Sequence, residues 1–198
     1  IDGSVDFFAI AVPGTDRIYE AAGSRESERL LTWPLSAGAN LGWQYTSFQK
    51  LSAQYQFRFD GFLRDRTTSE DYVVPRSTTT DGVGVGWEYR RGGYSLVANS
   101  TWFARRAWEA WGPADALVTS PRTYTKYSVS VSKEFYLNLL SKVRVNGAYF
   151  GGRGLDRFSQ YQFGLFDDTR IHGVPSAGVR FGELAMVRGS YSFNAFEQ

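Results

Sequence analysis

The sequence contains no cysteine and only one histidine, His172, among its 198 residues. One histidine without cysteine cannot form a multi-ligand zinc site, and as a general base it would need a nucleophile and an orienting acid beside it. No uninterrupted apolar run approaches 18 residues, so no transmembrane helix is predicted. The net charge is only +2, with both signs interspersed. We therefore expect no metal, no cofactor, no nucleic-acid partner and no enzymatic activity.

Glycine and aromatic residues are abundant, at 21 glycines and 17 % aromatic residues, a composition that suits antiparallel barrels. The clearest pattern is Leu35–Phe62, where two runs alternate between apolar and polar residues around a reversal at Ser47–Lys50. A period of two places the apolar side chains on one face of a strand. Each run has about ten residues or more, which is long enough for a tilted strand to cross a bilayer.

Weaker versions of the same alternation recur along the chain. The further expected strands are Ile1–Val12, Gly82–Tyr89, Tyr94–Phe103, Tyr124–Phe135, Val143–Phe150 and Glu183–Phe196. The charged stretch Thr15–Arg29 is expected to be an exposed loop or a short helical turn. Connections alternate between short ones (47–50, 90–93, 136–141) and long ones (63–80, 104–122, 151–182), as in outer-membrane barrels. A soluble sandwich has no reason to alternate loop lengths in this way.

We therefore expect an all-β fold, an antiparallel transmembrane β-barrel. About eight strands are visible, and residues 1–198 would form a single outer-membrane β-barrel domain that is part of a larger barrel. The expected location is the bacterial outer membrane. The residues expected to face lipid are Trp43, Tyr45, Tyr55, Phe57, Trp87, Tyr89, Tyr191 and Phe193. The polar residues expected to face the lumen are Gln54, Arg58, Asp60, Glu88 and Arg188.

Three other patterns have ordinary structural interpretations. Gly82–Gly86 alternates glycine with valine, but no Lys-Ser/Thr pair follows it, so small residues facing a lumen or a neighbouring strand are expected rather than a phosphate loop. Asp167-Asp168 is expected at a solvated loop tip rather than in a calcium site. An aromatic and basic group is expected to form an interfacial belt, with a sugar or partner surface as the alternative. Its members are Trp102, Arg105, Arg106, Trp108 and Trp111.

The segment Gly151–Val174, followed by Arg188-Gly189-Ser190-Tyr191-Ser192-Phe193, resembles the lid-loop region of the BamA-type outer-membrane assembly and two-partner-secretion superfamily. In that family an aliphatic-Arg-Gly-aromatic tetrad folds inward and its arginine pairs with carboxylates on the barrel wall. The matching tetrad here is Ile171-His172-Gly173-Val174, with histidine in the arginine position and valine for the aromatic residue; Arg170 could substitute. The resemblance covers residues 124–198 and implies Arg170, His172 and Gly173 as lid-loop candidates.

The leading functional hypothesis is accordingly a BamA-like barrel that inserts or translocates proteins. Its partners would be outer-membrane lipid and client or partner outer-membrane proteins. Three alternatives stay open: a porin or solute channel selective through its lumen charges, a structural barrel that anchors a partner complex through its long loops, and a soluble β-sandwich binding domain.

Overall fold

The computed structural model describes residues 2–11, 13–19, 26–137, 141–162 and 180–193. The eight long strands are β1 (Asp2–Ala11), β3 (Glu26–Thr46), β4 (Gln49–Arg64), β6 (Thr78–Arg91), β7 (Tyr94–Arg105), β9 (Thr123–Tyr136), β10 (Ser141–Arg153) and β13 (Leu184–Phe193). The short ones are β2 (Gly14–Tyr19), β5 (Tyr72–Val73), β8 (Gly112–Pro113), β11 (Tyr161–Gln162) and β12 (Arg180–Phe181). In these ranges no helix is long and apolar enough to span a membrane.

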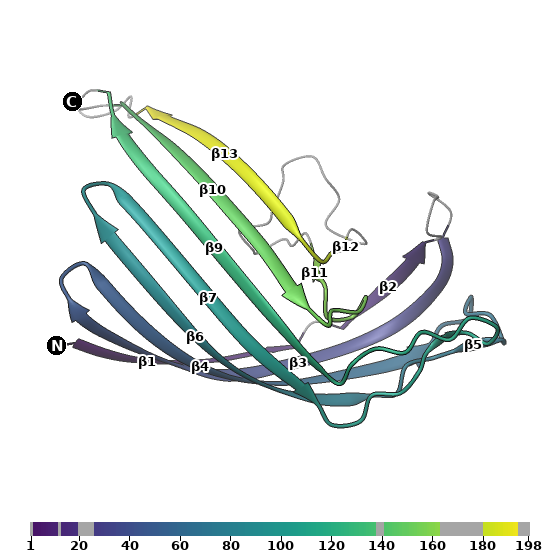
Figure 1. The fold of residues 1–198 in the computed structure, drawn as a ribbon. Coiled ribbons are helices and arrows are strands. Elements are labelled where there is room, and N and C mark those ends of the chain that lie inside the picture. The colour runs from purple at the N-terminus through teal and green to yellow at the C-terminus, as the bar shows by residue number, and fades with distance from the viewer. Residues whose placement is uncertain (1, 12, 20–25, 138–140, 163–179, 194–198) are drawn as a thin grey trace.

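The long strands form one antiparallel sheet in the order β1-β3-β4-β6-β7-β9-β10-β13, with β2 also paired to β3. The sheet is strongly curved, with its short turns at one end and its long connections at the other (Figure 1). The all-β antiparallel fold and the eight long strands are thus confirmed. Within the described residues β1 and β13 are edge strands, and the sheet is not closed, so a complete barrel stays a prediction.

The N-terminal region is more ordered than expected. The prediction of a loop or helical turn over Thr15–Arg29 is wrong for the described residues 15–19 and 26–29, because β2 pairs with the first part of β3, from Gly14↔Thr32 to Ile18↔Glu28; residues 20–25 of that stretch lie outside the described residues. β1 pairs with the rest of β3 and ends at Ala11↔Leu35. Pro34 therefore lies opposite the break between β1 and β2, and prolines within sheets are confined to edges and irregular positions of this kind. Both segments are rich in charged residues and do not alternate between apolar and polar side chains. The sequence pattern therefore did not indicate that β2 is a strand.

The turns follow local chemistry. The first hairpin reverses at Ser47 and Phe48 alone, so Gln49 and Lys50, expected in the reversal, begin β4 instead. The β6–β7 hairpin turns at Gly92 and Gly93, whose φ angles are +58° and +77°. Two successive positive φ values define the type I′ turn that matches the twist of the strands, and glycine adopts them without strain. The expected glycine turn is confirmed.

The sheet has two chemically different faces. Directly opposed residues project to the same face, and the register Trp43↔Leu51↔Trp87 continues across the sheet to Tyr149 and Ala185. Tyr191 lies six residues beyond Ala185 along β13 and so projects to the same face. All eight aromatic residues expected to face lipid share this apolar face, and the five expected lumen residues share the other. In β4, Leu51, Ala53, Tyr55 and Phe59 are exposed, whereas the polar residues between them are half-buried.

The polar face is the crowded one, as expected for the concave side of a curved sheet. Gly82, Gly84 and Gly86 all project onto it and are buried, between the exposed Val83 and Val85. A Cβ on Gly84 would lie 2.5 Å from the Thr101 Oγ1 and 2.6 Å from the Gln54 Nε2. These glycines thus make room for the side chains of the neighbouring strands.

The apolar core lies at the loop end of the sheet. We call it the rim core, and its members are Leu30, Phe62, Tyr72, Trp108, Trp111 and Phe158, with Ile18 and Val74 packed against it. Phe158 contacts Phe62 and Trp111 edge-to-face, at 4.8 Å between ring centroids in each case. The expected interfacial belt is therefore wrong for Trp108 and Trp111, which are 4 % and 6 % exposed. They pack with Leu30 of β3, Phe62 of β4 and Phe158 of the segment after β10, so the 106–122 connection is held against the loop end of the sheet.

Candidate functional site

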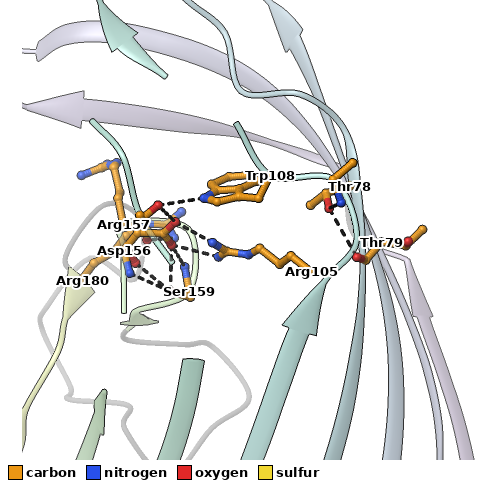
Figure 2. Close-up of polar contacts among 10 residues, drawn as sticks. Thr78, Thr79, Arg105, Trp108, Asp156, Arg157, Ser159 and Arg180 are labelled. Carbon is orange, nitrogen blue, oxygen red and sulfur yellow. Dashed lines mark hydrogen bonds and ion pairs between the residues drawn. The ribbon is translucent and has the colours of Figure 1, made fainter. Parts of the chain in front are cut away.

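A buried charge pair joins the sheet to the segment that follows β10. Arg105 is the last residue of β7, and Asp156 lies three residues beyond the end of β10. The guanidinium Nη1 and Nη2 donate to the two carboxylate oxygens at 2.6 and 2.9 Å, and each side chain is 3 % exposed. Figure 2 shows Arg105 reaching from the sheet toward Asp156. A two-pronged contact of this kind fixes orientation as well as distance.

Aromatic rings support the arginine. The guanidinium carbon of Arg105 lies 4.1 Å from the centre of the Trp108 ring and 4.8 Å from that of Tyr124. These are cation–π distances. Trp108 belongs to the rim core and Tyr124 to β9, so the charge is enclosed by residues from three parts of the chain.

Asp156 is saturated with donors. Its carboxylate accepts two hydrogen bonds from Arg105, one from the Ser120 hydroxyl at 2.8 Å, and two from Ser159, through the backbone N–H at 2.9 Å and the hydroxyl at 2.7 Å. Burial by itself raises the pKa of the Asp156 carboxyl. The hydrogen bonds and charge of Arg105, with those of the two serines, outweigh burial and hold this pKa below its usual value. The carboxylate is thus charged at neutral pH.

The segment anchored by Asp156 lies against the concave face. Tyr161, in β11, packs on Phe150 of β10 and stacks on Phe181 of β12, with ring centroids 5.5 Å apart in both pairs. The Lys126 ammonium lies 4.4 Å from the Tyr161 ring centre. Phe150 and Lys126 both belong to the polar face. The described parts of the 151–182 connection therefore fold inward over the sheet.

A second ionic contact crosses the open side of the sheet. The Asp16 carboxylate of β2 accepts hydrogen bonds from the Arg157 guanidinium at 3.2 Å and from the Arg180 guanidinium at 2.9 Å. Arg180 also donates to the backbone carbonyl of Arg157 at 2.8 Å. Figure 2 shows Arg157 and Arg180 beside Asp156. The two clusters are thus adjacent.

The residues expected to face a lumen lie on the concave face in separate small contacts. Arg58 pairs with Asp60, with Nη2 to Oδ1 at 2.7 Å. Gln54 donates to the Thr101 hydroxyl, and Glu88 pairs with Arg90. Arg188 is exposed on β13. The structure does not bring these five together into one site.

The lid-loop candidates Arg170, His172 and Gly173 lie outside the described residues, as do Asp167 and Asp168. The role of these candidates stays a prediction. Within the described ranges, no group of three or more histidine, cysteine, aspartate or glutamate side chains could hold a metal ion.

Sequence reasoning missed Asp156 and its partners. A local signal was present, because Asp156 and Ser159 form a compact turn in which the Ser159 N–H reaches the Asp156 carbonyl at 3.0 Å, and aspartate and serine favour such turns. No local signal indicated that Arg105 pairs with Asp156, and Arg105 was expected in the interfacial belt of aromatic and basic residues instead. The two residues are 51 positions apart.

The sequence matches no family model, no curated protein and no solved structure. The resemblance to the BamA-type superfamily therefore rests on the motif residues quoted above.

Proposed function

We propose that this chain forms the wall of an outer-membrane β-barrel whose connection 151–182 folds into the interior and is anchored there by the Arg105–Asp156 pair. The main support is β3. Trp33 and Trp43 project from its apolar face, 57 % and 51 % exposed, with Leu35 and Leu41 exposed between them. Ten residues span about 33 Å along a strand, or about 25 Å when the strand is tilted, which is the height of the apolar band of a membrane barrel.

Aromatic residues also gather where an interface would lie. At the short-turn end the Trp87 indole N–H donates to the Tyr45 hydroxyl at 3.3 Å, and Trp43 lies 6.1 Å from Tyr45 between ring centroids. Nearer the loop end, the Tyr55 hydroxyl donates to Asp81, which also pairs with Arg106. Tryptophan and tyrosine with polar partners are typical of membrane–water interfaces. The apolar face thus carries amphipathic groups at its short-turn end and again around Tyr55.

Within the barrel class, we propose protein insertion or translocation. The inward position of Gly154–Gln162 and the resemblance of residues 124–198 support this assignment. A soluble β-sandwich needs two sheets packed face to face, whereas the described strands form one large sheet and two two-stranded pieces.

The test is client insertion by the full protein reconstituted in liposomes. Arg170→Ala, His172→Ala and Asp156→Asn should each reduce insertion of an outer-membrane client. Glu109→Gln, which breaks the exposed loop pair with Arg76, should leave it unchanged. Full insertion activity in all three variants would contradict the proposal.

A porin or solute channel is the second candidate, favoured by the charged concave face with Arg58 and Asp60. Planar-bilayer recording separates the two. A large, steady conductance whose ion selectivity changes in Arg58→Gln or Asp60→Asn would favour the channel. A barrel that serves only to anchor a partner complex should show neither conductance nor client insertion.

A further inference from the structure

Asp16 occupies an unusual position for a carboxylate. It lies in β2, at the first edge of the sheet, yet its side chain is 5 % exposed and is bound by arginines 141 and 164 residues away in the sequence. Arg157 precedes Phe158 of the rim core, and Arg180 belongs to β12, just before the last strand. One carboxylate therefore contacts both ends of the 154–182 connection.

No strand pairing makes this link. Among the described residues β1 and β2 pair only with β3, and β13 pairs only with β10. β2 and β12 face each other across the open side of the sheet at the loop end (Figure 1). Besides Asp16, the contacts of β2 across this gap include the Arg17 backbone carbonyl, which accepts a hydrogen bond from the Arg157 guanidinium, and Ile18, which packs against the rim core containing Phe158.

We infer that Asp16, with Arg157 and Arg180, is a brace that sets the separation between the first strands and the end of the 154–182 connection at this rim. A ladder of backbone hydrogen bonds would hold two strands along their whole length. Here the Arg157 and Arg180 guanidiniums each donate to one carboxylate from the opposite side of the gap, and Arg157 also donates to the adjacent Arg17 carbonyl, so β2 is held at two neighbouring residues rather than along its length. Since the Asp16 side chain is buried and those of Arg157 and Arg180 are 20 % and 13 % exposed, solvent and salt screen the contact less than they screen a surface pair.

The charges of Asp16, Arg157 and Arg180 explain why this brace depends on the one carboxylate. Two guanidinium groups share one carboxylate, and burial together with the neighbouring positive charges of Arg157 and Arg58 lowers the pKa of Arg180. Without Asp16 both guanidiniums lose the carboxylate that ties them to β2, and the gap between β2 and the connection is then free to widen. The inference concerns the rim alone and does not depend on the proposed function or on membrane location.

The experiment measures the gap directly. Because the chain has no cysteine, cysteines introduced at the exposed positions Thr15 and Glu183 carry the only spin labels, and pulsed electron resonance gives their distance distribution. The variants are Asp16→Asn and the double variant Asp16→Asn/Arg180→Gln, which removes the brace while keeping the net charge of the cluster. Glu109→Gln, a loop ion pair with 64 % and 58 % exposed partners, is the matched control.

The unmodified protein should show one narrow distance distribution, and so should Glu109→Gln. Both Asp16 variants should show a broader distribution shifted to longer distances. If Asp16→Asn does not fold, the distance distribution of the double variant tests the inference, because in that variant the net charge of the cluster is the same as in the unmodified protein. A folded Asp16 variant with the narrow distribution of the unmodified protein would overturn the inference, even if client insertion or conductance had changed.

Discussion

Asp156 shows how one buried carboxylate can fix the position of a loop through its hydrogen bonds. Its five donors come from β7, from the 106–122 connection and from its own turn. An ion pair of this kind costs desolvation, and its geometry must compensate. Here every carboxylate lone pair is directed at a donor, and the arginine is covered by two aromatic rings.

Asp156→Asn should therefore destabilise the protein by about 3–5 kcal/mol, because Arg105 stays buried without a counter-charge. The measurement is the free energy of unfolding in urea. Glu109→Gln removes the exposed partner of Arg76 and should cost only about 0–1 kcal/mol. A cost for Asp156→Asn no larger than that of the control would contradict the buried pair.

The same carboxylate predicts a pH dependence. Since its pKa is lower in the folded state, the pair contributes its full stability above the usual aspartate pKa of about 4 and loses it as the pH falls through the folded-state value. The difference in unfolding free energy between the unmodified protein and Asp156→Asn should be constant above about pH 4 and shrink below it. A difference that already shrinks near neutral pH would exclude this assignment.

At the scale of strands, glycine marks where neighbours approach closely. Gly38 of β3 is one such place: an added Cβ would lie 2.5 Å from the Tyr55 carbonyl oxygen and 2.7 Å from the Phe8 ring. Gly147 of β10 is the opposite case, with nothing within 4 Å of an added Cβ. The two positions share a secondary structure and differ only in packing.

Gly38→Ala should therefore destabilise the protein by about 1–3 kcal/mol, since the backbone of β4 must move. Gly147→Ala should be neutral or stabilising by up to about 1 kcal/mol, because it restricts the unfolded chain without a clash. Urea unfolding of the two variants makes the comparison. Equal effects would mean that strand propensity, and not contact with β4 and Phe8, determines the cost.

At the scale of the molecule, the six tryptophans divide by face and provide a test of where lipid lies. Trp33, Trp43 and Trp102 are exposed on the apolar face, whereas Trp108 and Trp111 are buried in the rim core. If the apolar face contacts acyl chains, the two groups should respond differently to a lipid-borne quencher.

In reconstituted variants that keep one tryptophan each, bromine-labelled acyl chains should quench Trp43 strongly and Trp111 very little. Acrylamide in the water should quench neither efficiently. The two residues differ in environment but not in chemistry, so each is the other's control. Strong quenching of Trp43 by acrylamide with none by brominated lipid would contradict the membrane assignment.

The alternation of apolar and polar residues was enough to predict the eight long strands and their two faces, and the glycine pair was enough to predict the β6–β7 turn. Alternation of Leu41, Trp43 and Leu51 with polar residues is local information, and so is the Gly92-Gly93 turn. The β2–β3 pairing was not predicted, because the charged residues of both strands do not alternate with apolar residues at a period of two. The backbone hydrogen bonds between these strands form regardless of the side chains.

The contacts that the long connections make could not be predicted from the sequence. Trp108 and Trp111 are core residues because they pack with Leu30, Phe62 and Phe158, which come from β3, β4 and the segment after β10. Arg105 meets Asp156 across 51 residues, and Asp16 meets Arg180 across 164. Such contacts depend on how far the sheet curves and on which loops converge at its rim, and no spacing within a segment records either quantity.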